Sequence, residues 1–215
     1  MSTRERIAAQ RDRLAYEAAR IILEQGLTDF DRARRKAAER VGTPDRRHWP
    51  TNEAVQAAVL TQRRLFLGRA DTEERRRLRA AALQAMECFA PFSPRLVGGA
   101  LTGALSPQTR IELLLFADRA EDVIFALIEQ QIPWREAERI LRHRRGQRCP
   151  YPAFHFLAGD LPIELIVLPP RALRDLPLDP ITDRPFRGAD RVEVEHMLSA
   201  DQDEMMGPCS KGDAD

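Results

Sequence analysis

The feature that most constrains the fold is a change in hydrophobic periodicity just after Pro94. Before it, apolar residues recur at three- and four-residue steps, a spacing typical of amphipathic helices. After it come short apolar runs bounded by Gly, Pro and Asp, which are typical of strands. The expected helices are 3–24, 29–41, 52–67, 72–89 and 119–131, and the expected strands are 96–97, 111–116, 153–157 and 163–168. This order predicts an α+β protein, with an N-terminal helical bundle before a small mixed β-sheet and its covering helices.

The same patterns divide the chain into three regions. Residues 1–70 form the expected helical region, and residues 71–199 form the expected α/β core, which ends in a short helix over 189–199. Residues 200–215 are polar and acidic and contain Gly and Pro, so we predict a disordered tail there. Residues 134–150 are rich in arginine, and we predict them to be irregular or helical.

Charge and cysteine content limit the environment and the partners. The 215 residues are 43% hydrophobic, enough for a substantial core, and the formal net charge is only +1. No strong overall field therefore attracts nucleic acid or a membrane. The chain has no apolar run of about 18 residues, so no transmembrane helix is expected, and residues 1–13 lack the apolar segment of a signal peptide. The three cysteines are scattered, which indicates a reducing compartment, and we expect a cytoplasmic protein.

A candidate phosphate site lies where the periodicity changes. Gly98 and Gly99 directly follow a short apolar run, and Glu112 interrupts the next one. Glycines let backbone N–H groups approach a phosphate closely, and a strand carboxylate can hold a divalent metal that bridges the phosphate. Glu164 is a second lone carboxylate in an apolar strand, and such a group must be paired or face a solvated cleft. If the two strands are neighbours, Glu112 and Glu164 converge.

These residues resemble the signature of the nucleotidyltransferase superfamily of the DNA polymerase β type. In that family, Gly-Gly or Gly-Ser after a hydrophobic residue precedes two acids that flank one apolar residue on a strand, and a third acid lies on a later strand. Gly98-Gly99 match the first element, Glu112 the second acid and Glu164 the third, across about residues 72–170. The layout is also similar to that of a group of bacterial proteins with a helical N-terminal half.

The resemblance implies that the acids are catalytic and hold Mg²⁺, and that a nucleotidyl group passes from a nucleoside triphosphate to a hydroxyl. Arg110, however, stands where the first acid is expected. Three interpretations remain open: Glu112 and Glu164 hold a single Mg²⁺, Arg110 binds phosphate without a metal, or Arg110 and Glu112 form an ordinary ion pair on a sheet face. Ser106 and Thr109, in the link between the glycines and the strand, either bind the phosphate or stabilise a turn.

The helical region carries a second candidate surface, for nucleic acid. Arg32, Arg35 and Arg40 lie on one expected helix, and Trp49 follows a basic segment. Arginines can contact a phosphate backbone and a tryptophan can stack on a base. The alternative is a solvated helix face beside a tryptophan that covers a helix junction.

Two functional hypotheses follow, with a third as a structural alternative. The first is a nucleotidyltransferase-like protein with a degenerate metal site that binds a nucleoside triphosphate or an RNA end. The second is a non-catalytic module on the same fold that binds nucleic acid or protein. The third is a protein whose helical region pairs with another copy.

Overall fold

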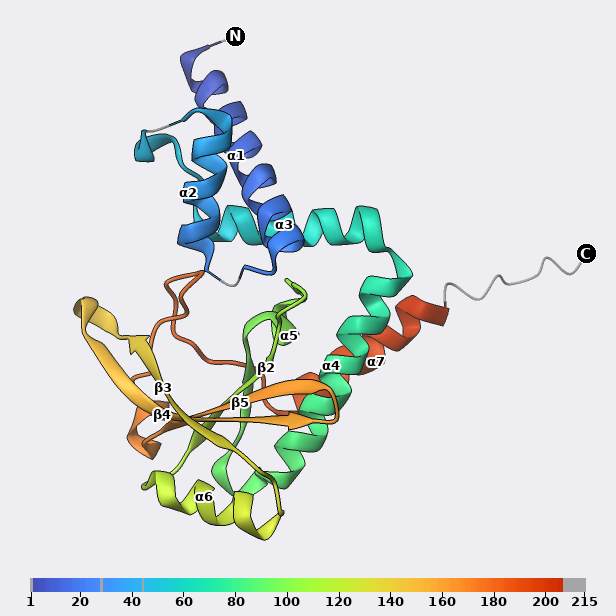
Figure 1. The fold of residues 1–215 in the computed structure, drawn as a ribbon, viewed down its shortest axis with the longest axis vertical. Helices are drawn as coiled ribbons and strands as arrows, with labels where there is room; N and C mark the ends of the chain where they lie inside the picture. The colour runs from blue at the N-terminus through green and yellow to red at the C-terminus, as the bar shows by residue number, and fades with distance from the viewer. Residues whose placement is uncertain (1, 28, 44, 207–215) are drawn as a thin grey trace, which may run out of the picture.

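The structure is a computed structural model that describes residues 2–27, 29–43 and 45–206 (Figure 1). Its helices are α1 (Thr3–Gln25), α2 (Phe30–Val41), α3 (Asn52–Leu67), α4 (Arg69–Cys88), α5 (Gly98–Thr102), α6 (Ala120–Glu129) and α7 (Arg191–Met206). Its strands are β1 (Arg95–Val97), β2 (Ile111–Phe116), β3 (Arg135–Arg142), β4 (Arg148–Ala158) and β5 (Leu161–Leu168). The expected α+β class, with a helical bundle before a mixed sheet, is confirmed for these residues.

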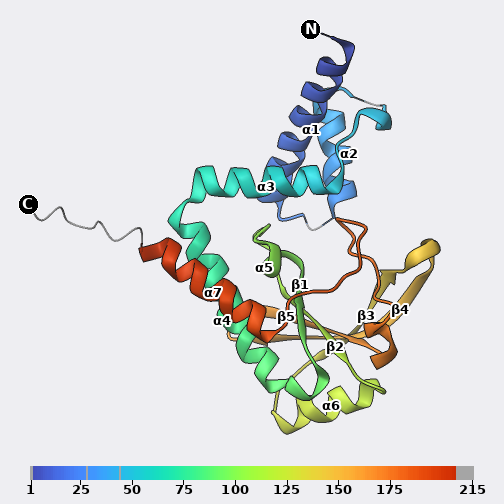
Figure 2. The same cartoon turned by 180° about the vertical axis from the view of Figure 1, so that it is seen from behind.

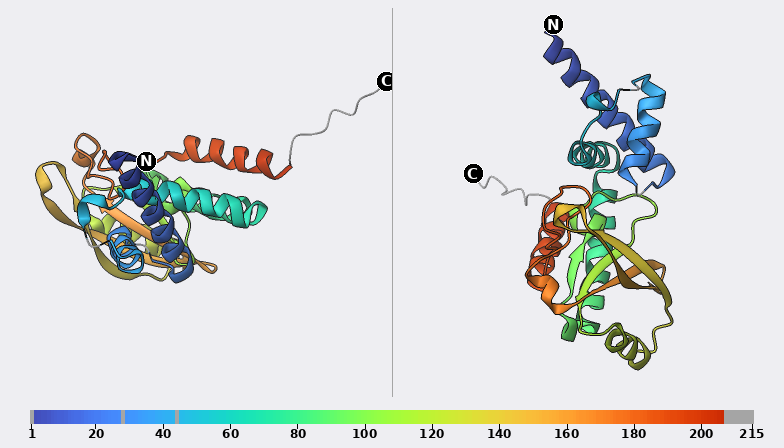
Figure 3. Two further views of the ribbon diagram at one scale, coloured as in Figure 1. Left: turned by 90° about the horizontal axis from the view of Figure 1, so that it is seen from above. Right: turned by 90° about the vertical axis from the view of Figure 1, so that its left-hand side faces the viewer.

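Helices α1, α2 and α3 pack around an apolar core of their own. Their facing stripes bury Leu14, Ile21, Val55 and Val59 almost completely, together with a row of alanines that lets the helices approach closely. The three helices stand at one end of the sheet, and α4 runs from them along the sheet with α7 beside it (Figures 1 and 2). The side view in the right panel of Figure 3 shows the same two-part arrangement.

The five strands form one mixed sheet in the order β1-β2-β5-β4-β3. Strands β2 and β5 lie side by side in parallel, and the other neighbouring pairs are antiparallel. The parallel pair requires a crossover, which α6 and the β3–β4 hairpin provide in sequence between them.

The two faces of the sheet have different environments because side chains alternate along each strand. Ile111, Leu113 and Leu165 point to one face, where α4, α6 and α7 cover them in the main core. Leu114 and Ile166 point to the other face, where the segment after β5 covers them with Ala172 and Phe186. Glu112 and Glu164 share this second face, where Glu112 lines a cleft and Glu164 is buried.

Two sequence predictions about local structure are wrong. Residues 134–150 are mostly strand, since β3 and the first part of β4 pair along their whole length. Because β3 is an edge strand, it carries charged residues on both faces. Its sequence therefore lacks the clear alternation of polar and apolar residues that predicts a strand. The predicted strand 153–157 is confirmed, but it is the end of a longer strand that begins at Arg148.

The C-terminal prediction is also wrong in part. Helix α7 continues to Met206, beyond the predicted end at residue 199 and into the segment 200–215 that we expected to be disordered. A tertiary contact stabilises this longer helix: Asp201 is 4% exposed and pairs with Arg79 of α4 at 2.7 Å. The remainder of that segment, residues 207–215, lies outside the described residues.

Among the residues that the structure describes, no helix has both the length and the apolar character needed to span a bilayer.

Candidate functional site

The register of the sheet brings the two strand glutamates together. Glu112 of β2 and Glu164 of β5 are direct partners in the parallel pair, and His155 of β4 is the antiparallel partner of Glu164. Arg135 of β3 is in turn the partner of His155. Direct partners point to the same side of a sheet, so four polar side chains form one row across four strands. Residues that are distant in the sequence therefore share one open polar face.

The diglycine bend lies against this row. Gly98 adopts a left-handed backbone conformation with φ +71°, and a Cβ atom there would lie 2.9 Å from Glu112 Oε2. Only a glycine can combine this φ with such a close carboxylate. At Gly99, a Cβ would lie 3.1 Å from the carbonyl oxygen of Ala104 and 3.1 Å from Thr109 Cγ2. The two glycines thus let the bend pack against β2 and the link that precedes it.

Two arginines supply positive charge to the glutamates. The Arg139 guanidinium lies 3.7 Å from Glu112 Oε2 and 3.6 Å from Glu164 Oε2, so it bridges both acids. Arg110 lies 3.7 Å from the same Glu164 oxygen. The other oxygen of Glu164 is hydrogen-bonded to His155 Nε2 at 3.0 Å. Glu164 is only 2% exposed, and its Oε2 has no hydrogen-bond partner among the described residues, so the arginines compensate its charge from a distance.

Glu112 has an unusual electrostatic environment. Burial raises the pKa of its carboxyl group, with the Glu164 charge acting in the same direction, while Arg139 and Arg110 oppose the rise. Its side chain is 18% exposed and projects into a cleft. The direction of the shift means that burial outweighs the stabilisation of the ionised form by the two arginines.

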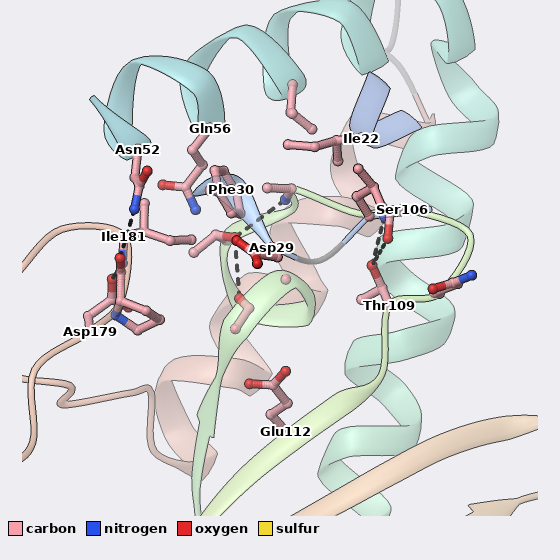
Figure 4. A pocket seen from close by; sticks show the side chains of 18 of the residues that line it. Ile22, Asp29, Phe30, Asn52, Gln56, Ser106, Thr109, Glu112, Asp179 and Ile181 are labelled. Atoms are coloured by element: carbon pink, nitrogen blue, oxygen red, sulfur yellow. Dashed lines mark hydrogen bonds between the residues drawn. The ribbon is translucent and has the colours of Figure 1, made fainter. Parts of the chain in front are cut away.

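The cleft lies between the helical part and the polar face of the sheet and has a volume of about 360 Å³. Helix α3 and the start of α2 form its upper wall, with Asn52, Gln56 and Phe30, while Glu112 lies at its floor (Figure 4). Asn52 Nδ2 donates a hydrogen bond to the carbonyl oxygen of Pro180 at 3.0 Å, which ties α3 to the segment after β5. Three segments remote in sequence therefore enclose one space, whose volume lies in the range of small-molecule sites.

Charge is distributed unevenly along this cleft. Asp29, Asp31 and Asp179 line the side near the helices, whereas Arg110 and Arg139 line the side near the sheet. The Asp29 carboxylate accepts a hydrogen bond from the Arg32 backbone N–H, and Asp179 accepts from two backbone N–H groups at 2.7 Å. The acids are thus held in place by the backbone and keep oxygen atoms available as acceptors.

Ser106 and Thr109 line the cleft but bond to each other. The Ser106 backbone N–H donates to Thr109 Oγ1 at 2.7 Å, and the two hydroxyl oxygens are 3.4 Å apart. Ser106 is 5% exposed. Their contacts account for a turn that leads into β2, which is one of the two roles that the sequence left open.

The predicted nucleic-acid residues of the helical region do not join this site. Arg32 and Arg35 are exposed on α2, and Arg40 pairs with Glu17 of α1 at 3.0 Å. Trp49 donates its ring N–H to the carbonyl oxygen of Thr43 at 3.1 Å and packs on the helical core. Arg46 lies over its ring at 5.4 Å. These contacts give Trp49 a structural role at a helix junction, in agreement with the alternative interpretation.

Arg139 is the site residue that sequence reasoning missed. It sits in the arginine-rich segment that was expected to be irregular or helical, and its position became meaningful only when that segment proved to be strand β3. Alternation along β3 places Arg135 and Arg139 on one face with Leu141, which reaches the core of that face. The even spacing of these three residues is compatible with one face of a strand, and it was the signal in the sequence that could have indicated β3.

Comparison with known proteins adds no assignment: the chain matches no protein-family model and no curated protein sequence.

Proposed function

We propose that this chain is a nucleotidyltransferase-like protein that binds a nucleotide in the cleft, with Arg110 and Arg139 as the phosphate-binding groups. The observation that carries the proposal is the convergence of Glu112, Glu164 and the two guanidinium groups beside the Gly98–Gly99 bend. Guanidinium groups form charge-assisted, often bidentate hydrogen bonds with phosphate oxygens. An incoming phosphate would exchange the long contacts to the glutamates for short ones.

The uneven charge of the cleft supports one orientation of the nucleotide. Phosphates would lie at the sheet side, against Arg139 and Arg110. Ribose hydroxyl groups and base amino groups, which donate hydrogen bonds, would face Asp29 and Asp179 at the helical side. The apolar residues Phe30 and Ile181 also line this part of the cleft and would contact the base.

The donor set does not fit a Mg²⁺ ion, although the family resemblance implies one. Mg²⁺ requires near-octahedral oxygen coordination, and each glutamate already has a guanidinium group within 3.7 Å, which would repel a cation. The raised pKa of Glu112 further disfavours the ionised ligand that a metal needs. We therefore propose binding without a metal, and Glu112 and Glu164 would balance the charge of the arginines when no phosphate is bound rather than carry out metal-assisted transfer.

Calorimetric titration with ATP and CTP, in Mg²⁺ and in EDTA, tests this function. We expect binding of similar strength in both buffers, and a loss of about tenfold or more in affinity for Arg139→Gln, because a charged hydrogen-bond partner of the phosphate is removed. Arg148→Gln is the matched control, since Arg148 is exposed on β4 and lines neither the cleft nor its rim. No binding of either nucleotide, or binding that Arg139→Gln leaves unchanged, would refute the proposal.

A further inference from the structure

A second groove adjoins the cleft at Arg110, the one described residue that lines both. It has a volume of about 530 Å³ and lies where β3 begins and β4 ends. Its described lining consists of Arg110, Pro133, Trp134, Arg135, His155, Phe156, Leu157, Pro162 and Ile163. This composition combines positive charge with aromatic and apolar surface.

The charge of the groove differs from that of the cleft. Of its described lining residues, Arg110 and Arg135 are cationic, while none is acidic. Glu164, the strand partner of His155, is 2% exposed and engaged by His155, Arg139 and Arg110. A ligand in this groove therefore meets a positive surface, and the complementary group is an anion.

Arg135 is available to such an anion. Its side chain is exposed, and within the described part of the chain it makes no hydrogen bond or ion pair. Its strand partner is His155, so both side chains stand on the same face near the open end of the polar row. Arg110 is 39% exposed and held only by a 3.7 Å contact, which leaves its guanidinium N–H groups free to turn towards the groove.

Trp134 gives the groove a second chemical character. It packs against the main core on one side and lines the groove on the other, so its ring is fixed while part of it stays accessible. An aromatic ring beside arginines is the combination that binds a base together with its phosphate. A lone phosphate would use the arginines only and would leave Trp134 and the exposed Leu157 without a role.

We infer that this groove is a second nucleotide site, which takes the phosphate of a nucleotide on Arg110 and Arg135 and its base against Trp134. The same chemistry is offered by a free mononucleotide and by a nucleotide within a single-stranded RNA. The inference shares one residue with the proposed function, because Arg110 lines both sites. If both sites bind, two nucleotides would lie side by side on one polar face.

Fluorescence of Trp134 reports on this site directly. In a Trp49→Phe background, Trp134 is the remaining tryptophan, and a stacked base should quench it. We would titrate AMP and a short single-stranded oligoadenylate into this protein and into its Arg135→Gln, Arg135→Lys and Arg148→Gln variants. Stronger binding of the oligoadenylate would identify an RNA strand as the ligand, and equal binding would identify a mononucleotide.

We expect saturable quenching that Arg135→Gln weakens about tenfold. Arg135→Lys should keep most of the affinity, and Arg148→Gln should keep all of it. No quenching with either ligand, or equal weakening by Arg135→Gln and Arg148→Gln, would overturn the inference. Arg139 lines only the cleft and Arg135 only the groove, so Arg139→Gln should weaken ATP binding about tenfold or more while the quenching persists. The two proposals can therefore fail separately.

Discussion

Two clusters of arginine and carboxylate side chains in this protein differ in how they are held. In the first, between α3, α4 and α7, Arg79 contacts Asp201 at 2.7 Å and donates to two backbone carbonyl oxygens. Arg63 in the same region is 4% exposed and bonds to Asp71 and to the carbonyl oxygen of Leu105. In the second, on the polar face of the sheet, Arg110 and Arg139 stay 3.6–3.7 Å from their glutamates and are more than a third exposed.

The comparison distinguishes a structural cluster from a candidate binding site. The short contacts of Arg63 and Arg79 engage these guanidinium groups with partners inside the protein, and they fix helices to one another. Long contacts beside a cleft leave donor groups that an incoming anion can use. Loss of a partner should therefore reduce stability in the first cluster and change binding in the second.

The largest effect is expected for Asp201→Ala. The substitution leaves the Arg79 guanidinium, 8% exposed, without its carboxylate partner and releases α7 from α4. Breaking a buried pair in this way costs about 3–5 kcal/mol of unfolding free energy, measurable by urea denaturation. Asp203→Ala on the same helix is the control, because Asp203 is exposed, and it should change stability by less than about 0.5 kcal/mol. Equal effects of the two substitutions would show that the buried cluster does not hold α7.

An intermediate effect is expected for Gly98→Ala. Its positive φ costs a residue with a side chain about 1–2 kcal/mol, and the new methyl group would meet the Glu112 carboxylate at 2.9 Å. Gly146→Ala is a matched control, since Gly146 has φ +78° and a methyl group there would meet no described atom within 4 Å. We expect Gly98→Ala to lose more stability than Gly146→Ala in urea and to weaken ATP binding as well. If Gly98→Ala lowers stability but leaves ATP affinity unchanged, the bend is not part of the binding site.

The smallest effect concerns pH. Burial raises the pKa of Glu112 above its ordinary value of 4.5, so the folded protein binds a proton there more readily than the unfolded chain does. The ionised carboxylate thus lowers stability, and this loss grows as pH rises from 4.5 through the folded pKa. Glu112→Gln should be more stable than the wild type at neutral pH, and the difference should shrink on acidification.

Urea denaturation across about pH 4–8 measures this difference, with Glu136→Gln as the control because Glu136 is exposed on β3. The control should show no such pH dependence relative to the wild type. A wild type that gains stability relative to Glu112→Gln as pH rises would contradict the assigned direction of the shift.

Much of the fold could be predicted from the sequence, because local patterns and caps agree with it. Gly26 and Gly42 end α1 and α2 in left-handed conformations, and the Thr51 side chain caps α3. The single carboxylate in the apolar run of β2 agrees with the structure, in which Ile111 faces the main core and Glu112 the cleft. Each of these signals acts within a few residues of the element that it defines.

What could not be predicted depends on contacts between distant segments. Strand β3 has charges on both faces, so only its pairing with β4 shows that it is a strand and brings Arg139 to Glu112 and Glu164. The end of α7 depends on Asp201 meeting Arg79, far away in sequence. The sequence singled out both glutamates and Arg110, whereas the role of Arg139, which bridges the two glutamates, emerged only from the sheet register.

The most direct test of the account is the ATP affinity of Glu164→Gln, measured by calorimetry in EDTA and in Mg²⁺. If guanidinium groups bind the phosphate, removal of the buried negative charge frees Arg110 and Arg139. The account predicts affinity equal to or tighter than that of the wild type, and independent of Mg²⁺. Weaker binding in the variant, together with a requirement of the wild type for Mg²⁺, would contradict it.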